Sequence, residues 1–394
     1  MKKNLKQIIG ACLTLTLLVL TAHRSWGEGE LAINHTATGF GRPPIPIAMD
    51  GVTGEESEVL KFDLYVQGFK FVLTPDTAQY VIHGNANGGV GGSLTDVVAR
   101  KVLFSRNYNG AGSRRLAHAF ADDIVLAVTG VKGIGQTQIA FKAQAADGTG
   151  EIYVADFDGY NAQAITHDNV IVARPAWVSG RMAMYYNSYK LGNPDIYYNN
   201  LATGERRVIA RYGGSNISPA VSPDGSKVAM VLSKGGSPNI YVCDANGSNL
   251  RQLTHSVEDS SPCWSPKGEW ICFATKLHGH RVLAKVSANG GEVQQLPIIG
   301  AYSPTEPDWS PDGKYIAFTR QTGDFDICIV PAEGGTAIPV ATGEDPSWSP
   351  NSRTLIYNHS VNYRAKLSVL DVFTKQFKDI KQVSGSNSEA SWKR

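Results

Sequence analysis

The 394-residue sequence lacks the short motifs of the common catalytic and metal-binding classes. It contains no Gly-x-Ser-x-Gly turn, which a serine hydrolase of the α/β class needs in order to expose its nucleophile. It also contains no His-Glu-x-x-His pair for a zinc ion, and none of its five cysteines forms a Cys-x-x-Cys pair. These absences argue against a serine hydrolase of this class, and we expect no metal ion and no cofactor.

The sequence has no hydrophobic run long enough for a helix that crosses a bilayer. The longest run, from residue 8 to residue 22, covers about 15 residues, whereas a spanning helix needs roughly 20. Basic residues Lys2, Lys3 and Lys6 precede it, and Ser25-Trp-Gly27 follows as a small-x-small cleavage site. Residues 1–27 are thus predicted to be an export signal peptide that sends the chain to the periplasm or the exterior. A retained membrane anchor is the alternative.

An excess of basic charge is also missing. Removal of residues 1–27 deletes four basic residues and no acidic one, so the formal charge changes from +2 to −2. A nucleic-acid partner would require a basic surface, and we exclude one. The four remaining cysteines lie in strand-like runs, which favours free buried thiols. A disulfide between Cys263 and Cys272, which flank one predicted hairpin, is the alternative in an oxidising compartment.

The main feature of the sequence is a repeated segment. It occurs six times: five copies place a proline two residues before a large side chain, four of them continue with Ser-Pro, and the degenerate last copy has Ala390 in place of the proline. The equivalent positions are Trp177, Val221, Trp264, Trp309, Trp348 and Trp392. Their separations of 44, 43, 45, 39 and 44 residues are typical of a β-propeller with four strands in each blade.

The turns and the chain ends predict a closed ring. Ser-Pro-Asp-Gly has the residue preferences of a type I turn, and alternating strand-like runs follow each copy. The last copy, at Trp392, supplies one strand, whereas residues 138–142, 151–156 and 162–166 supply three strands with no copy before them. Pairing these two ends completes a sixth blade and removes exposed sheet edges. Residues 137–394 are thus predicted to form a six-bladed all-β propeller, closed by pairing of its C-terminal strand with its first strands.

Residues 28–134 are predicted to form a small α/β domain before the propeller. A capping box at residues 53–56 starts a helix whose apolar residues continue at helical spacing to Leu73. A second helix is predicted from Ser113 to Gly130, with strands at residues 45–49, 79–83 and 101–105. The glycine-rich stretch 85–93 lacks the spacing of a phosphate-binding loop and is predicted to be a hairpin tip.

The spacing of the repeats also predicts where polar groups gather. Residues just before each inner strand lie where the chain returns to the propeller axis, so they are expected to surround one mouth of the central channel. Polar groups around a channel suit hydrogen bonding to an inserted loop of a partner protein. These predicted partner-binding residues are Arg174, Ser215, Asn216, Ser218, Asp259, Ser261, Glu306, Asp345 and Glu389.

Residues 113–142 resemble the domain junction of the TolB family, the periplasmic propellers of the Tol-Pal envelope system. The matches include His118, Asp122, Thr129-Gly130 and Lys132-Gly-Ile134, and the likeness extends through the Ser-Pro-Asp-Gly repeats. Val128, Gly135 and Gln138 differ from the family pattern. The likeness covers nearly the whole chain after residue 27.

The resemblance implies a non-catalytic periplasmic scaffold that acts in outer-membrane integrity, cell division and protein import. It implies binding of the peptidoglycan-associated lipoprotein Pal at the channel mouth, with residues 211–218 in the Pal-facing region. It also implies that the inner-membrane protein TolA contacts an N-terminal tail that includes Glu28, Glu30, Leu31 and Ile33. We expect a monomer.

Two alternatives remain open at this point. One is a propeller hydrolase or lyase with an acidic site at the channel mouth. The other is a propeller that binds sugars or cell-wall fragments, for which aromatic side chains near the mouth are expected.

Overall fold

A computed structural model describes residues 39–85, 89–110 and 112–394, and residues 44–394 form one compact unit. The predicted signal peptide, residues 1–27, and the predicted partner-binding tail residues Glu28, Glu30, Leu31 and Ile33 lie outside the described residues. Neither of the two α-helices described combines the length and the hydrophobicity that a membrane span requires.

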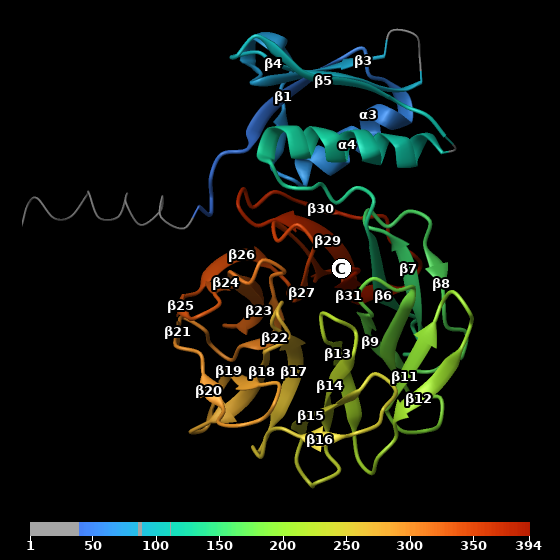
Figure 1. The fold of residues 1–394 in the computed structure, drawn as a ribbon, viewed down its shortest axis with the longest axis vertical. Coiled ribbons are helices and arrows are strands. Elements are labelled where there is room, and N and C mark those ends of the chain that lie inside the picture. Colours follow the sequence, from blue (N-terminus) through green and yellow to red (C-terminus); the bar gives the residue numbers. More distant parts are fainter. Residues whose placement is uncertain (1–38, 86–88, 111) are drawn as a thin grey trace, which may run out of the picture. The chain divides into compact units, whose positions relative to one another are not determined.

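The N-terminal α/β region has a five-stranded sheet with two helices packed on one of its faces (Figure 1). The strand order is β2-β1-β3-β4-β5, and β1 runs parallel to β2 and β3. Its elements are β1 (Ile45–Asp50), α3 (Gly54–Tyr65), β2 (Phe69–Phe71), a 3₁₀ turn η1 (Pro75–Thr77), β3 (Tyr80–Gly84), β4 (Val90–Asp96), β5 (Lys101–Tyr108) and α4 (Ser113–Thr129).

Two details of this region differ from the sequence predictions. Helix α3 ends at Tyr65, so Phe69 belongs to strand β2 and Leu73 is fully exposed. Gly68, with φ of +91°, reverses the chain between them, and few other residues adopt that conformation. In the glycine-rich stretch, Gly91 and Gly92 belong to β4 and not to the hairpin tip. They are glycines because a Cβ atom at either position would meet backbone atoms of a neighbouring strand.

The prediction of a six-bladed propeller is confirmed, with six four-stranded antiparallel sheets that follow one another around the ring (Figure 1). Blade 1 contains β31 (Ser386–Trp392), β6 (Gln138–Gln144), β7 (Gly150–Asp156) and β8 (Gln163–Ala164), and blade 2 contains β9 (Val172–Trp177), β10 (Ala183–Ser188), β11 (Asp195–Asn200) and β12 (Arg206–Ala210). Blade 3 contains β13 (Asn216–Val221), β14 (Lys227–Leu232), β15 (Asn239–Asp244) and β16 (Arg251–Gln252), and blade 4 contains β17 (Asp259–Trp264), β18 (Trp270–Leu277), β19 (His280–Ser287) and β20 (Gln294–Gln295).

The last two blades follow the same pattern. Blade 5 contains β22 (Thr305–Trp309), β23 (Tyr315–Gln321), β24 (Phe325–Pro331) and β26 (Ile338–Thr342), and blade 6 contains β27 (Glu344–Trp348), β28 (Thr354–Val361), β29 (Arg364–Asp371) and β30 (Phe377–Asp379). A short parallel pair, β21 (Ile298–Ile299) with β25 (Gly335–Thr336), joins the end of blade 4 to blade 5.

Ring closure occurs where the sequence predicts it. Strand β31 pairs antiparallel with β6, with Trp392 opposite Ile139 and Ser386 opposite Gln144. Both Trp392 and Ile139 are buried in one apolar cluster. The cross-blade packing thus continues through the closure without an exposed sheet edge at this point.

Tryptophan side chains on the inner strands join neighbouring blades. Three of them donate the indole N–H to a backbone carbonyl of the preceding inner strand: Trp177 to Ser391 (3.2 Å), Trp264 to Ala220 (2.9 Å) and Trp348 to Asp308 (3.1 Å). Trp309 differs, because its indole donates to Gly313 in its own blade. The recurrence of tryptophan in the repeat therefore has a structural reason, which is blade-to-blade hydrogen bonding inside an apolar interface.

The cysteines that the structure describes are Cys243, Cys263, Cys272 and Cys328, and all four are buried free thiols. Cys263 lies opposite Cys272 on β17 and β18. Burial raises the pKa of Cys243 to about 12 and that of Cys328 to about 11, so these two thiols are poor nucleophiles at neutral pH.

Candidate functional site

The candidate site is the end of the central channel at which the six inner strands begin. A cavity of about 330 Å³ lies along the axis and is lined by residues from all six inner strands. Six of the predicted partner-binding residues line it, one from each blade: Arg174, Ser218, Ser261, Glu306, Asp345 and Glu389. We call these six residues the mouth residues.

All six mouth residues adopt the left-handed backbone conformation, with φ between 51° and 55°. Each lies at a register shift between its inner strand and the second strand of the blade, so the regular ladder is interrupted there. This conformation costs about 1–2 kcal/mol for a residue with a side chain. Because this disfavoured conformation recurs in all six blades, we infer that each bulge serves to place its side chain on the cavity wall.

The backbone N–H of several mouth residues binds a side chain of the preceding blade. Ser218 donates to Asn187 (3.0 Å) and Glu389 to Asn358 (3.3 Å). In the same way, Arg174 donates to Glu389 (2.7 Å) and Asp345 to Glu306 (3.1 Å). The mouth is thus built by contacts between blades, and neighbouring blades fix the position of each mouth residue.

Charged groups concentrate on one side of the mouth. The guanidinium of Arg174 lies 2.9 Å from a carboxylate oxygen of Glu306 and 2.5 Å from one of Asp345. Lys142 forms an ion pair with Glu389 at 2.5 Å. The three carboxylates are only 10–16% exposed, whereas the side chain of Arg174 is 33% exposed.

The three carboxyl groups of this cluster differ in how readily they ionise. Burial opposes ionisation of Glu306 and Glu389, but Arg174 together with hydrogen bonds to Glu306 and with Lys142 beside Glu389 holds the pKa of each carboxyl below its ordinary value. Burial raises the pKa of Asp345 well above its ordinary value despite Arg174, because Glu306 and Glu389 also lie close by. Asp345 is thus the acid of this group that takes up a proton most readily.

Three other predicted site residues do not line the cavity. Asn216 is buried and holds its own loop: it accepts the N–H of Tyr212 and donates to the carbonyls of Pro194, Tyr212 and Gly214. Asp259 is buried and accepts the hydroxyls of Thr254 and Ser256. The backbone of Ser215 is bonded to Ser233. The structure thus gives these three residues local contacts that stabilise the rim of the mouth.

Exposed apolar side chains on the same face were missed by the sequence reasoning. Because strands alternate in direction, the loops before the inner strands and the loops between the second and third strands lie on the same face as the mouth. Six exposed apolar residues belong to these loops: Ile171, Tyr189, Leu191, Val257, Tyr302 and Tyr363. Their positions in loops gave no periodic signal, although their apolar character in otherwise polar loops was visible.

The far end of the channel is crossed by the chain itself. Arg394 donates from Nε to the carbonyl of Trp348 (3.1 Å), and its guanidinium forms an ion pair with Asp308. Its backbone carbonyl accepts the N–H of Gly180 at 3.4 Å. Since these partners belong to blades 6, 5 and 2, Arg394 spans this end of the channel, where it lines the same cavity as the mouth residues.

The described residues contain no candidate metal site. Across the described ranges, no cluster of three or more His, Cys, Asp or Glu side chains has an arrangement that holds a metal ion.

Comparisons with known proteins agree on one family. The profile of the TolB β-propeller domain matches residues 125–394. The Tol-Pal system protein TolB of Bordetella parapertussis is 29% identical over 413 residues, which cover 95% of this chain and 93% of that protein. The corresponding protein of Desulfosudis oleivorans is 35% identical over 165 residues, which cover 41% of this chain and 37% of that protein.

A crystal structure of TolB from Acinetobacter baumannii has the same fold. It superimposes with a TM-score of 0.81, covers 90% of this chain and 97% of that chain, and is 22% identical. At this level of identity, the likeness shows the fold alone. The profile match spans more than half of the sequence and includes the six repeats that form the mouth, and on this basis the chain belongs to the TolB β-propeller family.

Proposed function

We propose that this protein is the TolB component of a Tol-Pal system. In this role it is a periplasmic scaffold that binds a Pal-like lipoprotein at the channel mouth. The relatives with similarity along nearly the whole chain carry the name Tol-Pal system protein TolB. The proposal includes a second contact, between the N-terminal tail and a TolA-like inner-membrane protein, and a role in outer-membrane integrity and cell division.

The observation that carries the proposal is the composition of the mouth face. Polar and charged mouth residues on strained bulges surround a cavity of about 330 Å³, and exposed apolar side chains lie on the loops around it. Exposed apolar side chains that line a concave site suit contact with a partner. Tyr189, Tyr302 and Tyr363 belong to the residue type that is enriched in the energetically important parts of protein interfaces. A partner loop that enters the cavity while its body covers the rim uses both features.

Calorimetric titration with the soluble domain of a Pal-like protein tests this proposal. Val257 on the rim is 72% exposed, and Val208 on the outer strand of blade 2 is 40% exposed, so V257D and V208D introduce the same charge at two exposed sites. We expect V257D to weaken binding at least tenfold, because it places a charge in an apolar contact, and V208D to leave the affinity unchanged. Absence of binding by the folded wild-type protein, or equal effects of the two variants, would contradict the assignment.

A cell-wall or sugar ligand is a second candidate, since exposed tyrosines also stack on sugar rings. The rim tyrosines Tyr189, Tyr302 and Tyr363 supply this chemistry. Titration with soluble peptidoglycan fragments separates the candidates, because a sugar-binding propeller binds them without any protein partner.

A hydrolase or lyase at the mouth is disfavoured by Arg174. Its guanidinium binds both Glu306 and Asp345, the two carboxyls that would have to share acid and base work. The proposed role is therefore non-catalytic.

A further inference from the structure

A chain of buried charged side chains connects the α/β region to the propeller. The Nδ1 atom of His118, on α4, lies 2.7 Å from a carboxylate oxygen of Asp63, on α3. The Nε2 atom of the same ring lies 3.4 Å from a carboxylate oxygen of Asp158, in the turn between β7 and β8 of blade 1. Arg114, one turn earlier on α4, forms an ion pair with Asp158. His118 thus lies between a carboxylate of the α/β region and a carboxylate of the propeller.

Because Asp63, Asp158, His118 and Arg114 are largely buried, the ionisation of each side chain depends on the charges of the others. The side chains of Asp63, Asp158 and His118 are 0%, 1% and 4% exposed, and that of Arg114 is 16% exposed. An unpaired carboxylate at such a site carries a desolvation penalty of several kcal/mol. A protonated His118 compensates both carboxylates, whereas a neutral imidazole leaves them facing each other across its ring.

The direction of the pKa shifts agrees with this geometry. Burial acts to lower the pKa of His118, but Asp158 and Asp63 outweigh it and raise the pKa to about 10. Burial also opposes ionisation of Asp158, yet His118 and Arg114 hold its pKa below the ordinary value. The two carboxyl groups thus favour the protonated form of His118.

The segment that links the two parts is packed tightly against this charge cluster. Asp122, one turn after His118 on α4, accepts the N–H of Gly135 at 2.7 Å. A Cβ atom at Gly133 would lie 2.1 Å from a carboxylate oxygen of Asp122, and one at Gly135 would lie 2.9 Å from a carboxylate oxygen of Asp63. The linking segment therefore requires glycine at positions 133 and 135, where it packs closely against helix α4.

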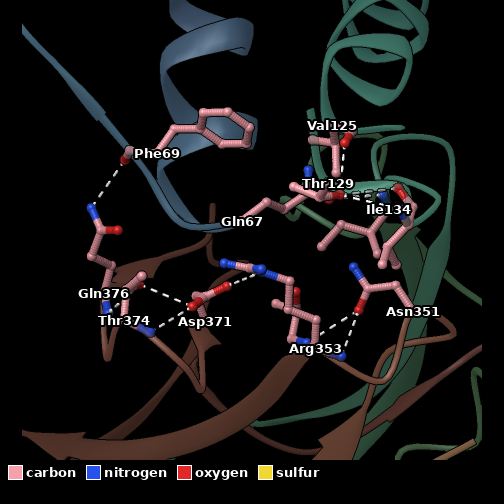
Figure 2. Close-up of polar contacts among 12 residues, drawn as sticks. Gln67, Phe69, Val125, Thr129, Ile134, Asn351, Arg353, Asp371, Thr374 and Gln376 are labelled. Carbon is pink, nitrogen blue, oxygen red and sulfur yellow. Dashed lines mark hydrogen bonds and ion pairs between the residues drawn. The ribbon is translucent and has the colours of Figure 1, made fainter. Parts of the chain in front are cut away.

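Neutral contacts form a second patch between the two parts (Figure 2). Gln67 accepts the N–H of Ile134, and Gln376 of blade 6 donates to the carbonyl of Phe69 at 3.1 Å. The buried ion pair Arg353–Asp371 of blade 6 adds a charged contact, because it packs against Gly68. This patch holds the α/β region from one side, and the His118 cluster holds it from the other.

We propose that protonated His118, bound between Asp63 and Asp158, is a latch that fixes the α/β region on the propeller, and that loss of its charge loosens this junction while the propeller stays folded. The α/β region has an apolar cluster of its own, but Phe62, Tyr65 and Val66 pack into a cluster of blades 1 and 6, so apolar contacts accompany the latch at the junction. The proposal does not depend on the identity of any partner.

The expected pH dependence follows from the groups that face His118. These are Asp63 on α3, Arg114 and Asp122 on α4, and Asp158 on the propeller. Burial raises the pKa of Asp63 to about 7, and the pKa of His118 is also raised. Groups with raised values contribute stability that is complete at low pH and is lost as the pH rises through the folded-state value. Since Asp158 has a lowered pKa, its contribution is lost only in acid. The contribution of Asp63 is lost as the pH rises to about 7 and that of His118 as it rises to about 10, so loosening of the junction between pH 7 and pH 10 is assigned to His118.

Hydrogen–deuterium exchange of the mature protein tests the latch. We compare D158N and H118Q with D123N, a matched control on α4 whose carboxylate binds Arg106 and Tyr108 within the α/β region only. We expect D158N and H118Q to speed exchange in residues 131–137 and in α4 at least tenfold at pH 7, with the blade strands unaffected. D123N should leave residues 131–137 unchanged.

A second measurement needs no variant. After correction for intrinsic exchange rates, wild-type residues 131–137 should exchange at least tenfold faster at pH 10 than at pH 7, while the inner strands keep their protection. Unchanged junction exchange in D158N, an equal effect of D123N, or a pH-independent wild-type junction would each overturn the proposal. If H118Q does not fold, D158N and the wild-type pH series still decide it.

Discussion

Removal of the Arg174 charge gives the most direct test of how the mouth is held together. Arg174→Met keeps much of the apolar stem and deletes the guanidinium that binds Glu306 at 2.9 Å and Asp345 at 2.5 Å. Breaking a fully buried ion pair by removing one partner costs about 3–5 kcal/mol, whereas exposed pairs contribute about 0.2–1 kcal/mol. Because Arg174 is 33% exposed and its partners are 10–16% exposed, we expect a loss of about 2 kcal/mol in the free energy of unfolding at pH 7.

The pH dependence of this loss identifies its cause. Without Arg174, the carboxylates of Glu306, Asp345 and Glu389 repel one another, and they relieve the repulsion by binding protons. The destabilisation in urea titrations should therefore be at least halved at pH 5. Glu306→Gln together with Asp345→Asn should rescue R174M at pH 7, since the triple variant buries fewer uncompensated charges.

A matched control is available outside the mouth. Arg320 forms an ion pair with Asp326 at 2.8 Å, with side chains that are 17% and 23% exposed, so R320M removes an arginine of similar burial that faces one carboxylate. We expect R320M to cost less than R174M and to respond less to pH. A loss below about 0.5 kcal/mol for R174M, or an R174M loss that does not change between pH 5 and pH 7, would refute the electrostatic explanation of the mouth.

Three further outcomes are expected from features of the fold. Trp264→Phe should lower the free energy of unfolding by about 1 kcal/mol more than Trp309→Phe, because only Trp264 donates its indole N–H to another blade; urea titration of both variants checks this. Gly68→Ala should lower the melting temperature by several degrees in calorimetry, since its Cβ atom would lie 1.9 Å from a guanidinium nitrogen of Arg353 and the glycine has a φ of +91°. Ser261→Gly should stabilise the protein by about 0.5–1 kcal/mol in urea, because glycine adopts the left-handed conformation without strain; a loss of stability would show that the Ser261 side chain contributes more than its backbone costs.

The six-bladed architecture could be predicted from the sequence because each copy of the repeat corresponds to one blade. Each copy combines a turn with fixed backbone requirements and strands of regular spacing, so six copies define six blades. The missing strands of the last copy predicted the pairing of β31 with β6, which the structure confirms. In the α/β region, the helix predicted up to Leu73 was wrong after Tyr65. The apolar spacing continues past that point, and only Gly68 marked the reversal.

The site was accessible only in part. The repeat placed one residue of each blade at the mouth, because equivalent positions in a ring lie at equal distance from its axis. Which side chains contact each other was not accessible: Arg174 binds Glu306 and Asp345, which lie in blades on another part of the ring. The sequence also gave no sign that Asn216 forms hydrogen bonds within its own loop, since that depends on the backbone path around it.

The closure of the ring by β31 and β6 determines when the protein can finish folding. Ile139 and Trp392, which are paired in blade 1, are separated by roughly 250 residues of chain. Bringing such distant segments together costs about 5 kcal/mol of loop entropy if the intervening chain is still unfolded. During synthesis, five blades can form in order as they emerge, whereas the first three strands of blade 1 must wait for their inner strand. Until the final residues arrive, β6 presents an open edge, and this is the interval in which the chain is most exposed to misassembly.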